Sequence, residues 1–101
     1  MSVLMNYAMF PTDKGSSVSE YVSKIVKMIS ESGYDYKLTA MGTIVETETL
    51  EQALDIVSKS YELLKNDSQR VYSTVSFDIQ TNKPIGRIRT KVESVEDKIK
   101  Y

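Results

Sequence analysis

The pattern of hydrophobic and polar residues predicts two long β-strands, one at the start of the chain and one after residue 70. Residues 3–10 (VLMNYAMF) contain few helix breakers and end at Pro11. Residues 70–79 (RVYSTVSFDI) are rich in β-branched and aromatic side chains. These features are typical of strands, whose side chains point alternately to the two faces of a sheet.

Two shorter strands are predicted in the middle of the chain, at residues 36–40 and 43–47. The pair Met41-Gly42 separates them as a tight connection, in which we expect Gly42 to supply a positive φ.

Apolar residues at helical spacing predict two amphipathic helices, over about residues 18–31 and 50–64. A hydroxyl residue followed three positions later by Glu or Gln precedes each, as in a capping box. These boxes run from Ser17 to Glu20 and from Thr49 to Gln52. Gly33 fits a left-handed stop after the first helix.

The C-terminal segment also has helical spacing, with apolar residues at Ile85, Ile88, Val92, Val95 and Ile99. Pro84 can occupy the first turn of this helix. Alternatively, the helix begins only near Lys91, after a third capping box from Thr90 to Glu93.

The predicted order is strand-helix-strand-strand-helix-strand, followed by a C-terminal helix. This order is that of the split β-α-β, or ferredoxin-like, α+β fold. Right-handed crossovers give an antiparallel sheet with strand order 4-1-3-2 and both main helices on one face. We therefore expect a single domain over residues 1–101, with residues 84–101 as an appended helix and one face of the sheet bare.

Strand alternation assigns two sets of side chains to this bare face. They are Leu4, Asn6, Ala8 and Phe10 from the first strand, and Tyr72, Thr74, Ser76 and Asp78 from the fourth. The mixture of apolar bodies and a few polar groups is typical of a small-molecule pocket. Half of a dimer interface is the alternative. In either case we expect the amide of Asn6, in a central strand, to need a hydrogen-bond partner.

The composition excludes several kinds of chemistry. The chain has no Cys and no His, which removes Cys-ligated zinc, cysteine nucleophiles and Ser-His triads. Its 13 Lys and Arg balance 14 Asp and Glu, which argues against nucleic-acid binding by bulk electrostatics. Apolar runs are too short for a membrane span, and the signal-peptide pattern is missing. We expect a soluble cytoplasmic protein with no metal, cofactor or catalytic residue, since only Glu46 and Asp78 remain as weak general-base candidates.

Several strings of residues together carry a family resemblance. They are Pro11 after the first strand, SSVSEYV at 16–22, MGTIVET at 41–47, RVYSTVSFD at 70–78 and KVESVEDKI at 91–99. In these strings the chain resembles the thiamine-binding protein family of small ferredoxin-like proteins. It departs from the family in its longer turn after Pro11. It also has Ile79-Gln80 where the family often has an acid and an Arg.

The resemblance implies non-catalytic binding of thiamine or a hydroxymethylpyrimidine-like compound, as a carrier, buffer or sensor. The aromatic rings and carboxylates would face the thiazolium cation, the amide would pair with the aminopyrimidine, and the hydroxyls would add single hydrogen bonds. The residues expected to form this site on the open face are Asn6, Phe10, Thr43, Glu46, Tyr72, Thr74, Ser76 and Asp78. A structural homo-oligomerisation module without a ligand is the alternative.

Self-association is expected in both cases. The bare face and the apolar stripe of the C-terminal helix predict a homo-oligomer, either a dimer or a dimer of dimers with sheets face to face. We also expect Val92, Val95 and Ile99 to stabilise the protein through burial.

Overall fold

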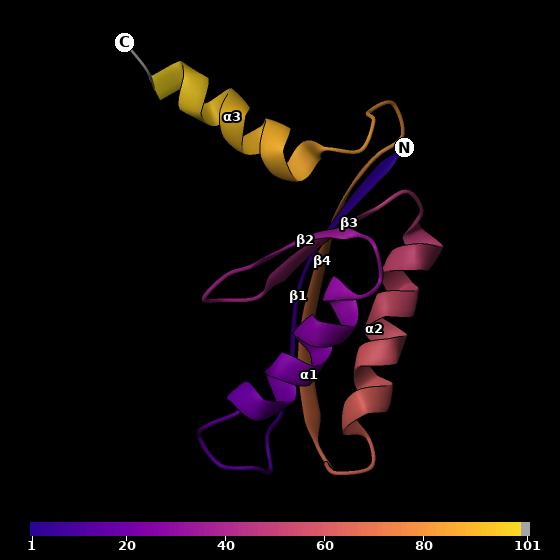
Figure 1. Ribbon diagram of the computed structural model, residues 1–101, viewed down its shortest axis with the longest axis vertical. Coiled ribbons are helices and arrows are strands. Elements are labelled where there is room, and N and C mark those ends of the chain that lie inside the picture. Colours follow the sequence, from indigo (N-terminus) through magenta and orange to yellow (C-terminus); the bar gives the residue numbers. More distant parts are fainter. Residues whose placement is uncertain (100–101) are drawn as a thin grey trace.

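An antiparallel sheet with the strand order β2-β3-β1-β4 organises the protein, as seen in a computed structural model that describes residues 1–99. The elements are β1 (Ser2–Pro11), α1 (Ser19–Ser30), β2 (Asp35–Leu38), β3 (Thr43–Thr47), α2 (Leu50–Leu64), β4 (Val71–Gln80) and α3 (Arg87–Ile99). Figure 1 shows α1 and α2 packed against the sheet, with α3 extending away from it at the other end of the molecule. The predicted ferredoxin-like α+β fold and strand order are confirmed.

The core lies between the sheet and the helices α1 and α2. Alternate residues of β1 point into it, together with apolar residues of β3 and of the two helices. Its buried members are Val3, Met5, Tyr7, Met9, Ile25, Ile29, Val45, Ala53, Ile56 and Leu64. The matching residues of β4, such as Val75, Phe77 and Ile79, share this side of the sheet but remain exposed, because β4 is an edge strand.

One of the two predicted capping boxes at the main helices forms. Thr49 Oγ1 accepts a hydrogen bond from the backbone N–H of Gln52 at 3.2 Å, and Gln52 Oε1 accepts one from the N–H of Thr49 at 3.1 Å. The box at Ser17 is wrong: α1 has Val18 as its N-cap, without a side-chain capping bond. Val18 is half-buried, and its backbone carbonyl accepts the first hydrogen bonds of the helix, from the N–H groups of Tyr21 and Val22 at 3.0 Å.

The β2–β3 connection corrects the expectation for Gly42. Its φ is not positive; among the glycines, Gly15, Gly33 and Gly86 have positive φ, which confirms the predicted left-handed position at Gly33. A Cβ atom on Gly42 would lie 3.0 Å from both Asn6 Oδ1 and the carbonyl oxygen of Tyr7. Glycine is therefore required here by close approach to β1 rather than by backbone conformation.

The C-terminal helix begins at Arg87, between the two predicted starts. Gly86, with φ of 117°, turns the chain into it, and the third capping box is not used. The side chains of Val92, Val95 and Ile99 are 50%, 62% and 64% exposed. The single chain therefore does not bury them, and the burial expected of them stays a prediction about the oligomer. The last two residues of the predicted helix segment lie outside the described residues.

No helix among residues 1–99 combines the length and the apolar character that a membrane-spanning helix needs.

Candidate functional site

The open face of the sheet carries two neighbouring rows of side chains that run across all four strands. One row contains Asp35, Glu46, Leu4 and Asp78, and the next contains Lys37, Ile44, Asn6 and Ser76. The first turn of α3 lies against the first row, where it contacts Glu46 and Asp78. The second row is not covered by these contacts. It forms a surface beside the helix, called the floor below.

A cavity of about 370 Å³ lies between this floor and α3. Its lining is mostly apolar, with Leu4 and Ile44 on the sheet and Ile88 and Val92 on the helix. This volume falls in the lower part of the range usual for small-ligand pockets, about 300–1,000 Å³. The cavity is the best-formed candidate site on the open face.

Glu46 is buried under α3 and holds the helix in position. Its carboxylate accepts hydrogen bonds from the backbone N–H groups of Gly86, Arg87 and Ile88 at 3.1–3.4 Å, and from Ser2 Oγ at 2.5 Å. Burial by itself raises the pKa of Glu46, but the hydrogen bonds from Ser2 and from the α3 backbone outweigh it and lower the pKa. Glu46 thus fills the role of an N-terminal cap for α3.

Asp78 is also engaged by α3. Its carboxylate lies 2.6 Å from Lys91 Nζ and 3.2 Å from Arg87 Nη1. The hydrogen bond from Lys91 and the charges of Lys91 and Arg87 lower the pKa of Asp78. Neither Asp78 nor Glu46 is therefore a free carboxylate on the open face.

Arg87 is a structural residue that the sequence reasoning missed. Its side chain is buried and donates to Ser2 Oγ, to the Ser2 carbonyl and to the Asp78 carbonyl at 2.7–2.9 Å. A cation in the first turn of a helix opposes the helix dipole, and this unfavourable position was the available signal of a specific partner.

Asn6 lies on the cavity floor with its side chain exposed, and that side chain has no hydrogen-bond partner among residues 1–99. Of the two partners expected for this amide, a neighbouring side chain is therefore absent among the described residues, which leaves a bound ligand or water in that place. The adjacent Ser76 also lines the cavity, and its Oγ donates to the Asn6 carbonyl at 3.4 Å.

The other predicted site residues are spread more widely. Phe10 and Tyr72 are neighbours on the open face, with ring centroids 5.8 Å apart, but neither lines the cavity. Thr74 borders a smaller hollow of about 120 Å³, which it shares with Asn6 and Ser76.

Thr43 does not lie on the open face, which corrects its predicted position. It is paired with Tyr7, and both point toward the helices. There it lines a separate cavity of about 220 Å³ beside α1.

The fold and cavity define a small α+β protein of the ferredoxin-like class. The chain belongs to the thiamine-binding protein family, whose model matches residues 5–96. A UPF0045 protein of Methanothermobacter thermautotrophicus is 35% identical over 85 residues, which cover 83% of this chain and 85% of the relative.

Two solved structures share the fold. A hypothetical protein from Methanocaldococcus jannaschii superimposes with a TM-score of 0.84 at 27% identity, covering 95% of this chain and 97% of that one. A Thermotoga maritima protein, provisionally assigned to thiamine biosynthesis or salvage, gives a TM-score of 0.76 at 20% identity, covering 91% and 99%.

Proposed function

We propose that this protein binds thiamine or a hydroxymethylpyrimidine-like, thiamine-related compound without catalysing a reaction, as a carrier, buffer or sensor. Family membership supports the chemical class of the ligand. The observation that carries the proposal is the unpartnered amide of Asn6 on the floor of a mostly apolar cavity.

The cavity suits a flat heterocycle with a polar edge. Leu4, Ile44 and Ile88 offer apolar surface to its ring. An aminopyrimidine presents donors and acceptors on one edge, and the amide of Asn6 has one acceptor and two donors to match them. The hydroxyl of Ser76 is the adjacent polar group. A few polar groups among apolar walls fix the orientation of a ligand.

A binding role fits the state of the two carboxylates better than catalysis does. Glu46 is committed to the backbone of α3, and Asp78 to Arg87 and Lys91. Both have lowered pKa values, which makes them weak general bases at neutral pH.

A structural homo-oligomerisation module is the second candidate, and the exposed valines of α3 favour it. An apolar stripe on a helix that extends away from its own domain is typical of an interface. Oligomerisation and ligand binding are compatible, so we propose a homo-oligomer, a dimer or a dimer of dimers, in both cases.

Thermal unfolding with and without ligand distinguishes the two candidates. The probes are thiamine, hydroxymethylpyrimidine and their phosphate esters. A ligand at a hundred times its Kd adds about 2.7 kcal/mol of stability, which raises the Tm of a domain this size by about 10–20 °C. No shift with any probe at millimolar concentration would leave the oligomerisation module as the better explanation.

The variant Asn6→Leu tests the site itself. Since the fold does not use the amide, we expect a folded protein of unchanged or higher stability that binds ligand at least tenfold more weakly in calorimetry. Asn66→Leu, an exposed amide outside the cavity, is the matched control and should bind normally. Unchanged affinity in a folded Asn6→Leu variant would remove Asn6 from the site.

A further inference from the structure

The cavity between the open face and α3 has an unbalanced charge. Its lining includes the cationic side chains Lys37, Arg87 and Lys91 but a single anionic one, Asp78. The formal excess is two positive charges, in a protein whose overall net charge is −1. Glu46 lies nearby but does not line the cavity, and the N–H groups at the start of α3 and the Ser2 hydroxyl occupy its carboxylate.

Lys37 contributes the part of this excess that nothing within the fold balances. Arg87 and Lys91 share the carboxylate of Asp78. Lys37 has no ion-pair or hydrogen-bond partner for its side chain among the described residues. Its side chain is exposed but lines the cavity, so its ammonium is available to a ligand bound there.

This arrangement favours a ligand that carries a negatively charged group. Glu46 and Asp78 were expected to face the thiazolium ring, but both are committed to α3 and its side chains. A positively charged ligand would meet the unpaired ammonium of Lys37 without a free carboxylate to offset it. A negatively charged ligand would instead neutralise the excess.

We propose that the ligand of this cavity is a thiamine-related pyrimidine that carries a phosphate ester, with its phosphate bound by Lys37. This inference rests on the function proposed above and specifies the chemical form of the ligand. Lysine is a common phosphate ligand because its ammonium is a compact, flexible point charge.

The geometry of the floor suits a ligand that is polar at both ends. Lys37, Ile44 and Asn6 are cross-strand neighbours in one row. Adjacent strands lie about 4.8 Å apart, so the backbone positions of Lys37 and Asn6 are separated by roughly 10 Å. Ile44 between them provides the apolar surface for the ring. The heterocycle edge then meets the amide of Asn6, and the phosphate meets the ammonium.

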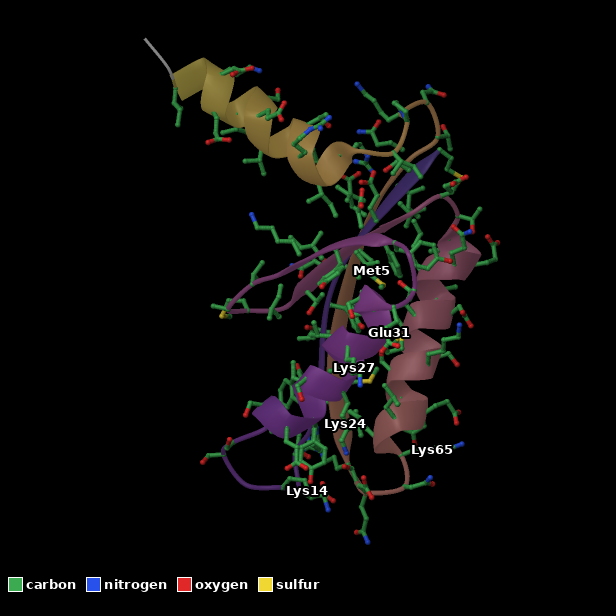
Figure 2. All side chains as sticks on the ribbon, in the orientation of Figure 1. Met5, Lys14, Lys24, Lys27, Glu31 and Lys65 are labelled. Atoms are coloured by element: carbon green, nitrogen blue, oxygen red, sulfur yellow. The ribbon has the colours of Figure 1, made fainter. Side chains whose placement is uncertain are left out.

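Calorimetry on the full chain with matched ligand pairs tests the proposal. The pairs are hydroxymethylpyrimidine with its phosphate, and thiamine with thiamine monophosphate; inorganic phosphate is a separate probe. We expect each ester to bind at least tenfold more tightly than its unphosphorylated partner, and the ratio to fall as salt rises. Lys37→Gln should reduce this ratio about tenfold. Lys14→Gln, at the opposite end of the molecule from α3 (Figure 2), should leave it unchanged.

The outcomes separate the two proposals. Equal affinities within each pair, or tighter binding of the unphosphorylated compounds, would overturn the phosphate ester as the ligand's form but leave the proposed function intact. An unchanged ratio in Lys37→Gln would overturn the role of Lys37. Inorganic phosphate binding as tightly as the esters would show that the cavity does not recognise the pyrimidine. No binding of any compound would overturn the proposed function and this inference with it.

Discussion

The carboxylate of Glu46 in β3 accepts a hydrogen bond from the backbone N–H of Arg87 at 3.1 Å, across 41 residues of sequence. The same carboxylate accepts a bond from the hydroxyl of Ser2 at the start of β1. One side chain in the sheet therefore connects the first strand to the beginning of the last helix. The position of α3, and with it the wall of the cavity, depends on this contact.

Glu46→Gln should destabilise the protein. The amide has one acceptor oxygen and no charge for the N–H groups of Gly86, Arg87 and Ile88, so some of these groups lose their partner. We expect a loss of about 1–3 kcal/mol in the free energy of unfolding at pH 7, measured with urea. Glu48→Gln, exposed and two positions along the chain, is the control and should change stability by less than about 0.5 kcal/mol.

The same variant should also alter the acid dependence of stability. The native pKa of Glu46 lies below its ordinary value of 4.5. Above about pH 4.5 the carboxylate is ionised in both states and its stabilisation is complete. As the pH falls from there through the native pKa, the unfolded chain takes up the proton first, and the stabilisation is lost. Wild type should therefore lose more stability than Glu46→Gln in this range, and parallel curves would contradict the assignment.

Gly42→Ala should affect both stability and ligand binding. The added Cβ would lie 3.0 Å from the Tyr7 carbonyl, so either the turn or β1 must shift. We expect a loss of about 1–3 kcal/mol. Because Asn6 Oδ1 is equally close, its amide is displaced and ligand affinity falls as well.

Gly15→Ala serves as the comparison for Gly42→Ala. Gly15 has a positive φ but open space around it, so the alanine costs about 1–2 kcal/mol through backbone strain alone. Its ligand affinity, measured by calorimetry, should equal that of wild type. If Gly42→Ala also bound ligand normally, the turn would have no part in positioning Asn6.

The exposed apolar side of α3 should mediate self-association. Val95→Ser combined with Ile99→Ser should reduce the molar mass measured by light scattering. Thermal unfolding of the separated subunits should change little, because these side chains are largely exposed within one chain. Glu96→Ser, on the same helix, is the control and should keep the wild-type mass. A monomeric wild type at micromolar concentration would contradict the prediction.

The fold could be predicted because its determinants are local and repeat along the sequence. Alternation in β1 and β4, helical spacing in α1 and α2, and the capping box at Thr49 each depend on residues a few positions apart. The capping box predicted from Ser17 to Glu20 does not form, although its sequence fits. The half-buried Val18 is the N-cap residue instead. A sequence pattern of four residues does not show which of two neighbouring residues becomes the N-cap.

The candidate site was predicted only in part, since its construction depends on contacts distant in sequence. Asn6, Ser76 and Asp78 were correctly placed together from alternation and strand order. Thr43 was misplaced, although its pairing with Tyr7 follows the same alternation. The hydrogen bonds between Glu46 and the start of α3 join residues 40 or more positions apart, so a local pattern does not predict them. The place of Lys37 in the cavity lining also depends on α3, which lies far from β2 in the sequence.

The polar contacts that attach α3 to the sheet are gathered at the start of the helix, at Gly86, Arg87, Ile88 and Lys91, and this has a dynamic consequence. The residues of α3 that line the cavity, Arg87, Ile88, Lys91 and Val92, lie in its first two turns, while the rest of the helix extends beyond the domain. A helix held in this way opens as a separate local unfolding unit, without loss of the sheet. Amide hydrogens of α3 should therefore exchange with solvent sooner than those of β1. The contacts of Glu46, Arg87 and Lys91 together then set how often the cavity opens, and a bound ligand slows that opening.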